Sequence, residues 1–277
     1  MAQVENDSAH GDAVAIAVAQ FASGTDKTEN LSVIRELATT ATARGARLVV
    51  FPEYSSFFTA ELGPQSVAAA EPLDGPFVEG LSMIATELGV HLVAGLLETT
   101  DDASRFSNTI VAVDGRGAVV AKYRKLHLYD AFGQRESDWV VPGLIEEPET
   151  FVVGGLTAGI QTCYDIRFPE VTRRLVDAGA DLVVVPSEWV RGPLKEQHWR
   201  TLVTARALEN TIYLAAADQA PPIGAGNSMI VDPMGVELAT IGETRDVALA
   251  WASASRIAQV RVVNPALQLR RFRLTSG

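Results

Sequence analysis

Short, almost wholly apolar runs recur along the chain, and segments with helical spacing lie between them. The clearest runs cover residues 13–21, 48–51 and 182–186. Strands that are apolar on both faces are typical of sheets that helices cover. Turn signals at residues 114–117 and 232–235 also predict antiparallel hairpins. The pattern therefore predicts an α/β fold with a mixed sheet or two stacked sheets.

Three longer helices are predicted by amphipathic spacing, over residues 28–43, 76–88 and 195–210. Thr28 is the expected N-cap of the first helix, and Gly45 is expected to end it. No linker and no shift in composition divides the chain. We therefore expect a single domain.

The chain carries more acidic than basic residues. Its 277 residues include 34 acidic and 23 basic ones, for a net charge of −11. Because no lysine- or arginine-rich run breaks this acidity, nucleic acids and anionic membranes are poor partners. No stretch approaches the roughly 18 uninterrupted apolar residues of a membrane span, and the polar start lacks the apolar centre of a signal peptide. A cytoplasmic protein is the expectation.

Both ends of the chain differ from its body. Residues 1–12 lack the apolar side chains that would offset the entropy of ordering, and they are expected to form a disordered tail. Residues 266–277 carry three arginines and are expected to form a C-terminal tail that docks on a neighbouring subunit in a dimer, or frays. The domain itself is expected to cover residues 13–265.

The glycine motifs of two common nucleotide-binding folds are missing. Residues 20–24, which follow the first predicted strand, do not form the G-x-G-x-x-G fingerprint, and the chain contains no G-x-x-x-x-G-K loop. Cys163 is the only cysteine, which excludes an internal disulfide framework and a multi-cysteine zinc site.

Cys163 lies between an apolar run, residues 156–160, and a segment with helical spacing that begins at Phe168. A strand, a tight turn and a helix start would raise the thiol above the sheet edge, beside backbone N–H groups without helical partners. Such donors can stabilise a developing oxyanion. A lone cysteine is also compatible with a small, inert, buried residue, so Cys163 by itself leaves both interpretations open.

Two other polar residues lie where apolar strands end. Glu53 follows residues 49–52, and Lys125 follows residues 120–124. Because ligands gather at the carboxyl ends of strands in open α/β sheets, Glu53, Lys125 and Cys163 can converge. The carboxylate would take the thiol proton during attack on an amide or nitrile carbon, and water would then hydrolyse the thioester. Taken singly, Glu53 could be a helix-start carboxylate and Lys125 a solvated cation.

Three segments together resemble the signature motifs of the nitrilase superfamily of carbon–nitrogen hydrolases. In chain order they are Phe51-Pro-Glu53, Tyr123-Arg-Lys125-Leu-His127-Leu and Cys163-Tyr-Asp-Ile-Arg-Phe-Pro-Glu170. The similarity extends from about residue 13 to residue 265. This resemblance implies a four-layer α-β-β-α sandwich that pairs with a second copy, as a homodimer or a higher homo-oligomer.

The same resemblance implies which residues are catalytic. It gives a triad of Glu53, Lys125 and Cys163 that works without a metal and without an organic cofactor. A second glutamate of the family matches Glu136, which by analogy orients Lys125 and the substrate amide. Lys125 and the Tyr164 N–H would stabilise the charge that develops during attack.

The residues after the cysteine resemble one branch of the superfamily. Nitrilases usually have Trp-Glu after the nucleophile, whereas this chain has Tyr164-Asp165. The motif resembles ω-amidases and deaminated glutathione amidases, which implies hydrolysis of an amide in a small carboxylate-bearing substrate. Glu188 and Trp189 stand where that branch usually has a small residue and a phenylalanine. Since this wall normally faces the substrate, we expect Glu188 and Trp189 to contact it.

A substrate carboxylate requires a cation in this acidic protein. The candidates are Arg167, Arg173, Arg191 and Lys195. We assign Arg173 to the substrate site, and we expect Arg167 to form a structural ion pair with Asp165.

A Cys–His dyad is a further arrangement to consider, because His127 and His198 could pair with Cys163. The resemblance favours lysine and glutamate instead. His127 is therefore expected to be a hydrogen-bonded structural residue.

Three functions are compatible with these residues. The first is a thiol amidohydrolase that acts on a small ω-amide through a thioester and releases ammonia. The second keeps the same triad but acts on an N-carbamoyl amine or a nitrile, although the missing Trp-Glu argues against nitriles. The third is a non-catalytic binding protein on the same fold.

Overall fold

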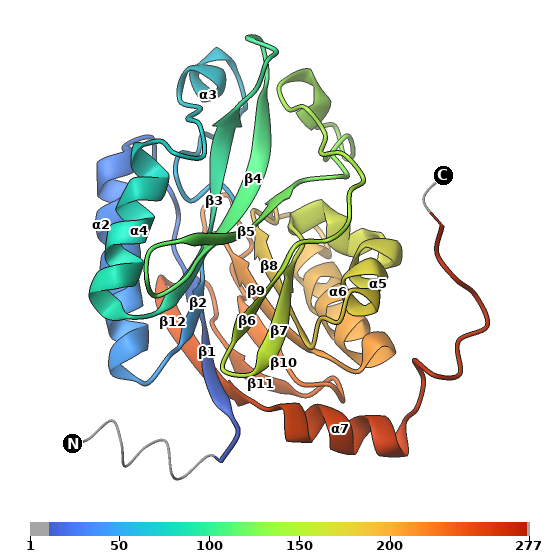
Figure 1. The fold of residues 1–277 in the computed structure, drawn as a ribbon. Coiled ribbons are helices and arrows are strands. Elements are labelled where there is room, and N and C mark those ends of the chain that lie inside the picture. Colours follow the sequence, from blue (N-terminus) through green and yellow to red (C-terminus); the bar gives the residue numbers. More distant parts are fainter. Residues whose placement is uncertain (1–10, 276–277) are drawn as a thin grey trace.

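Two six-stranded β-sheets form the centre of the molecule (Figure 1). The structure, a computed structural model, describes residues 11–275. The first sheet contains, in spatial order, β12 (Asp246–Ala252), β1 (Val14–Gln20), β2 (Leu48–Val50), β3 (His91–Thr99), β4 (Phe106–Val113) and β5 (Val119–Arg124). The second contains β11 (Glu237–Thr240), β10 (Met229–Val231), β9 (Tyr213–Asp218), β8 (Leu182–Ser187), β7 (Leu156–Ile160) and β6 (Thr150–Val153).

Each sheet mixes parallel and antiparallel pairs. Strands β1, β2 and β3 are parallel to one another, as are β7, β8 and β9, and the outer strands pair antiparallel. The two predicted hairpins are present, because β4 pairs with β5 and β10 pairs with β11. The expected α/β class is therefore confirmed, and of the two arrangements left open the structure has two sheets.

Helices cover the outer face of each sheet (Figure 1). Helices α2 (Lys27–Ala43) and α4 (Pro76–Leu88) pack on the first sheet, and α5 (Pro169–Asp177) and α6 (Lys195–Asn210) pack on the second. A short helix, α3 (Pro64–Ala68), contacts β3, and α7 (Ala254–Val263) follows β12. These layers form the expected four-layer α-β-β-α sandwich in a single domain.

The apolar runs are explained by burial on both faces of each strand. On β1, Ile16 and Val18 point into the core between the two sheets, whereas Ala17 and Ala19 point toward the helices of the first sheet. All four side chains are fully buried. Full burial of a valine or isoleucine side chain contributes about 1.5–3 kcal/mol, so the runs stabilise the sandwich from both sides.

Asp26, and not Thr28, is the N-cap of α2. The Asp26 carboxylate accepts hydrogen bonds from the backbone N–H groups of Thr28 and Glu29, at 2.8 and 3.2 Å. The expectation for Thr28 was wrong because a carboxylate can accept from two of the unpaired N–H groups at once. Gly45, at φ +96°, leaves the helical conformation beyond the C-cap Arg44, as expected.

The ends of the chain lie only partly within the described residues. Most of the tail expected to be disordered, residues 1–12, lies outside them, but the Asp12 carboxylate accepts hydrogen bonds from Ser255 near the start of α7. In the described part of the C-terminal tail, Arg270 pairs with Asp177 of α5 at 2.5 Å. Docking on a neighbouring subunit stays a prediction. Within residues 11–275, no helix is both long and apolar enough to cross a membrane.

Candidate active site

Residues from both sheets meet at one edge of the sandwich. Glu53 follows β2 and Lys125 follows β5 in the first sheet, and Cys163 follows β7 in the second. Lys125 contacts Glu53 directly, and all three residues line one cavity. The convergence expected from the strand ends is therefore present in the structure.

Lys125 is held between two glutamates. Its ammonium nitrogen lies 2.9 Å from Oε1 of Glu53 and 2.9 Å from Oε2 of Glu136, and its side chain is 2% exposed. Burial opposes the charge, but the carboxylates of Glu136 and Glu53 outweigh it and hold the pKa of Lys125 well above its ordinary value. Lys125 is therefore a fixed ammonium at neutral pH.

Glu53 has a hydrogen-bond partner at each oxygen. Oε1 accepts from Lys125 and from the Asn108 amide, the latter at 2.6 Å, while Oε2 accepts from the Glu188 backbone N–H at 2.7 Å. Burial raises the pKa of Glu53, although Lys125 opposes the shift. Glu53 is thus shifted toward the range in which a carboxylate can take up a proton and release it.

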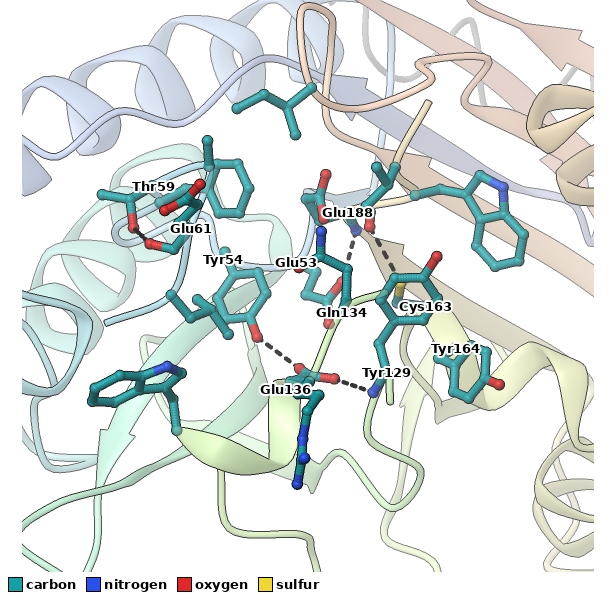
Figure 2. A pocket seen from close by; sticks show the side chains of 18 of the residues that line it. Glu53, Tyr54, Thr59, Glu61, Tyr129, Gln134, Glu136, Cys163, Tyr164 and Glu188 are labelled. Atoms are coloured by element: carbon teal, nitrogen blue, oxygen red, sulfur yellow. Dashed lines mark hydrogen bonds between the residues drawn. The ribbon is translucent and has the colours of Figure 1, made fainter. Parts of the chain in front are cut away.

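The carboxylate of Glu136 behaves in the opposite way. It accepts from the Tyr54 hydroxyl at 2.7 Å and from the Tyr129 N–H at 2.6 Å (Figure 2). It also accepts from Lys125. Burial works against ionisation, but Lys125 and the Tyr129 N–H lower the pKa of Glu136 below its ordinary value. The two glutamates that contact Lys125 thus have pKa values shifted in opposite directions. Glu53, with the raised pKa, can exchange a proton, whereas Glu136, with the lowered pKa, stays charged.

Cys163 occupies a sharp turn between strand and helix. It begins the short 3₁₀ helix η2 (Cys163–Arg167) with φ +45°, in the left-handed region. For a residue with a Cβ this conformation costs about 1–2 kcal/mol. The thiol Sγ donates to the Glu188 carbonyl at 3.4 Å. Burial, with a contribution from Glu53, raises the pKa of Cys163 well above its ordinary value, so the resting group is a thiol.

These groups face a cavity of about 370 Å³, a size suited to a small molecule. Figure 2 shows Glu53, Tyr129, Cys163 and Glu188 around it, with Glu136 between Tyr54 and Tyr129. Its remaining walls come from the segments around residues 58–62, 133–139 and 188–190. The predicted residues Tyr164, Glu188 and Trp189 all line the cavity. Their contact with a substrate stays a prediction.

The expected pairing of Arg167 with Asp165 was wrong. Asp165 is fully buried and accepts instead from the Tyr123 hydroxyl, the His127 backbone N–H and His127 Nδ1, at 2.7, 2.9 and 2.7 Å. These three donors occupy the carboxylate, so the Arg167 guanidinium turns toward aromatic rings. Its Cζ lies 4.9 Å from the centre of the Trp189 ring. His127 has the structural role expected of it.

Arg173 does not reach the cavity, which corrects the assignment to the substrate site. It lies on α5, where its electrostatic neighbours are Glu209 and Asp177. Arg191 also faces elsewhere and pairs with Glu243 at 2.6 Å. Of the four candidate cations, Lys195 lines the cavity. Its ammonium donates to the Tyr129 hydroxyl at 2.7 Å.

Sequence reasoning missed two residues that shape the site. The Asn108 amide donates to both Glu53 and Glu136, at 2.6 and 3.1 Å. Tyr54 donates to Glu136 and is also buried. The signal for Tyr54 was its position directly after Glu53. Asn108 had no local signal, because its partners lie 55 and 28 residues away.

A thiol, a carboxylate with a raised pKa and a fixed ammonium around a small cavity are the groups that a hydrolase of the thiol type uses. Residues 15–262 match the family model described as carbon-nitrogen hydrolase, and the chain belongs to this family. It is thus an enzyme that hydrolyses carbon–nitrogen bonds other than peptide bonds, within the nitrilase superfamily.

Two relatives that match over most of this chain are named as a hydrolase and as an amidase. The chain is 39% identical to a Mycobacterium tuberculosis protein named as a hydrolase, covering 89% of this chain and 91% of the relative. It is 37% identical to the deaminated glutathione amidase of Escherichia coli O157:H7, covering 93% and 97%.

Two solved structures show the same fold. The NitFhit protein of C. elegans has a TM-score of 0.84 at 30% identity, and the match covers 94% of this chain but only 65% of that longer one. An amidase from Nesterenkonia sp. AN1, in complex with acrylamide, has a TM-score of 0.80 at 28% identity and covers 94% and 95%. The four-layer architecture is therefore that of known carbon–nitrogen hydrolases.

Proposed function

We propose that this enzyme is a cysteine-dependent amidohydrolase that cleaves the amide of a small carboxylate-bearing substrate and releases ammonia. The single observation that carries the proposal is the arrangement of Glu53, Lys125 and Glu136 beside the Cys163 thiol in one cavity. The names of the relatives, which include amidases, agree with this class of substrate.

The first half of the reaction forms an acyl-enzyme. Glu53 takes the Sγ proton of Cys163 while the sulfur attacks the amide carbon, and the carbonyl oxygen becomes an oxyanion. The Lys125 ammonium and the Tyr164 N–H stabilise this charge. Glu53 then gives its proton to the leaving nitrogen, the C–N bond breaks, and ammonia leaves a thioester on Cys163.

In the second half of the reaction, water hydrolyses the thioester, and Glu53 again acts first as a base and then as an acid. Glu53 takes a proton from the incoming water, the hydroxide oxygen attacks the thioester carbon, and a second oxyanion forms at the same donors. The C–S bond breaks, the proton on Glu53 returns to the sulfur, and the acid product leaves. Water is the only co-reactant consumed.

Glu136 serves this cycle as a permanent anion. Its lowered pKa keeps it charged while Glu53 changes protonation state. It therefore holds Lys125 in place when the attraction of Glu53 is lost on protonation. The Tyr54 hydroxyl and the Tyr129 N–H fix its own orientation.

Lys195 supplies the positive charge for a substrate carboxylate in the cavity, and Arg167, which contacts the Trp189 ring without lining the cavity, adds to the positive potential there. The Lys195 ammonium lies 5.3 Å from the centre of the Trp189 ring, on which Arg167 also lies. Within residues 11–275, neither cation forms an ion pair with a carboxylate. The charge of Lys195 is thus available to an anionic end of the substrate, whose amide reaches Cys163.

Ammonia release from a small panel of amides tests the proposal. Glutaramate, the monoamide of glutaric acid, α-ketoglutaramate and deaminated glutathione are incubated with wild type and with Cys163→Ala. Ammonia from wild type alone supports it, and equal release from both proteins contradicts it. Carbon dioxide together with ammonia from an N-carbamoyl amine would indicate the carbamoyl alternative, and cleavage of a nitrile alone would indicate a nitrilase. Binding without any turnover would indicate a non-catalytic protein.

A further inference from the structure

The Glu188 carboxyl lies in the cavity wall, and the proposed reaction does not use it. The side chain is 9% exposed, and its Oε1 is buried without a hydrogen-bond partner in the described part of the chain. A buried oxygen left unpaired costs about 1–3 kcal/mol. Such a group in a ligand cavity therefore needs an explanation, and a hydrogen-bond donor on the ligand provides one.

Hydrogen bonds fix the backbone at Glu188 in the cavity wall. Its N–H donates to Glu53 and its C=O accepts from Cys163, while the next residue, Trp189, donates its N–H to Asp218 at 2.6 Å. The Glu188 backbone is thus held next to the reacting groups by these bonds, and its side chain lines the cavity from there.

Two cations lie beside the Trp189 ring, and of these Lys195 lines the cavity. The ring of Trp189, the neighbour of Glu188 in the chain, carries Arg167 at 4.9 Å and Lys195 at 5.3 Å. Arg167 Nε and Nη2 are buried without hydrogen-bond partners among the described residues. Nevertheless, the ion pairs found in that part of the chain do not join Glu188 to either cation. Burial and the neighbouring Glu53 raise the pKa of Glu188 well above its ordinary value, and Lys195 opposes this shift only in part. A cation bound in the cavity beside Glu188 would therefore favour its charged form.

We propose that Glu188 binds a protonated amine of the substrate, next to the carboxylate bound by Lys195, so that the enzyme prefers ω-amides of α-amino acids. In an α-amino acid a single carbon carries both the ammonium and the carboxylate. A site for it needs an acid and a base close together but not paired, which is the arrangement in this wall. This inference rests on the proposed amidase function and specifies its substrate class.

Two amides that differ only in the α-amine test the inference. L-Glutamine and glutaramate share the chain length, the ω-amide and the carboxylate. We expect wild type to hydrolyse glutamine with a kcat/KM at least equal to that for glutaramate. Glu188→Ala should lower kcat/KM for glutamine about tenfold or more and change that for glutaramate less than about threefold.

A second variant and a binding assay make the result independent of folding and turnover. Glu188→Gln keeps the size of the side chain but cannot become an anion beside a bound ammonium, so it should lower the glutamine-to-glutaramate ratio in the same direction. In Cys163→Ala, calorimetry should show tighter binding of glutamine than of glutaramate, and the added Glu188→Gln change should remove the difference.

Each negative result identifies what has failed. Hydrolysis of glutaramate with a glutamine-to-glutaramate ratio that Glu188→Ala and Glu188→Gln leave unchanged would overturn the inference and keep the amidase function. Equal binding of the two amides to Cys163→Ala would overturn it as well. Absence of ammonia from every amide, together with absence of binding, would overturn both this inference and the proposed amidase function.

Discussion

Glu53 and Cys163 are joined through the two backbone groups of one residue, although they follow strands of opposite sheets. The N–H of Glu188 donates to the Glu53 carboxylate at 2.7 Å, and its C=O accepts from the thiol at 3.4 Å. One peptide segment therefore sets the spacing of the proposed base and nucleophile. Because backbone groups do this, substitution of the Glu188 side chain leaves the link in place.

Loss of the Lys125 ammonium should affect both stability and turnover. Lys125→Met leaves two carboxylates buried without their counter-ion, which we expect to lower the free energy of unfolding by about 3–5 kcal/mol. Loss of an oxyanion partner should lower kcat by about 10²–10³-fold. Urea unfolding and steady-state kinetics measure the two effects.

Lys122→Met is the matched control for Lys125→Met. Lys122 lies on the same strand segment but pairs with Glu149 at the surface, so its loss should cost no more than about 1 kcal/mol. Equal unfolding midpoints for the two variants would contradict the assigned role of Lys125.

The pH dependence should separate the two glutamates. Glu53 must be ionised to accept a proton, and burial raises its pKa. The acid limb of kcat/KM should therefore have its midpoint above the ordinary value of 4.5. A profile that is flat down to pH 4.5 would exclude Glu53 as the group that titrates.

Stability should change with pH in opposite directions for these carboxyls. Glu53, with a raised pKa, contributes stability that is full below the unfolded-state value and is lost as pH rises through its folded-state pKa. Glu136, with a lowered pKa, contributes stability that is present above 4.5 and is lost as pH falls. At neutral pH, Glu136→Gln should therefore destabilise the protein and Glu53→Gln should not. Thermal melts between pH 4 and pH 8 give both curves.

Alkylation of Cys163 should be slow at neutral pH and accelerate as pH rises. The raised pKa makes the resting residue a thiol, and only the thiolate reacts with iodoacetamide. Mass spectrometry of the labelled protein follows the rate. A plateau already reached at pH 7 would show that the cysteine rests as a thiolate, and Glu53 would then not be needed as its base.

The cation pair should control recognition of a carboxylate without acting on the amide itself. Lys195→Met should raise KM for glutaramate about tenfold, because the anion loses the cation that lines the cavity, and Arg167→Met should raise it less. Valeramide, the neutral amide of the same chain length, supplies the control and should be hydrolysed with an unchanged kcat/KM. An equal loss on both amides would indicate a structural role for Arg167 and Lys195.

The cap of α2 gives a prediction about folding alone. Asp26→Ala should lower the free energy of unfolding by about 1 kcal/mol, and Thr28→Ala by less than about 0.5 kcal/mol. Asp26 is exposed, so neither change should alter turnover. A larger effect at Thr28 in chemical denaturation would restore the first assignment.

The architecture followed from the sequence because burial on both faces leaves a pattern in the chain itself. β1 is apolar on both faces from Val14 to Ala19, and β8 is apolar on both faces from Leu182 to Val185. β6 was not predicted, because it is an edge strand whose Val152 is 64% exposed and whose apolar pattern has no buried second face. The short helix α3 was missed as well, since five residues are too few for a period to show.

The convergence of Glu53, Lys125 and Cys163 followed from position and their catalytic roles came only from the family resemblance, whereas the partners of individual side chains followed from neither. Glu53, Lys125 and Cys163 each come directly after a predicted strand, so topology alone brings them to one edge. Arg167 and Asp165 are neighbours in sequence, but the buried carboxylate bonds to donors some forty residues away. Which partner a buried acid takes depends on packing across the sheets, and local spacing contains no record of it.

The hydrogen bonds of Asp165 join the segment that carries Lys125 to the turn that carries Cys163. Tyr123 and His127 flank Lys125 on either side, and both bond to Asp165, two positions after Cys163. These hydrogen bonds therefore fix the position of the Cys163 turn relative to the Lys125 segment. Transplanting either motif alone into another scaffold would leave a buried acid without its donors, so the two must be grafted together.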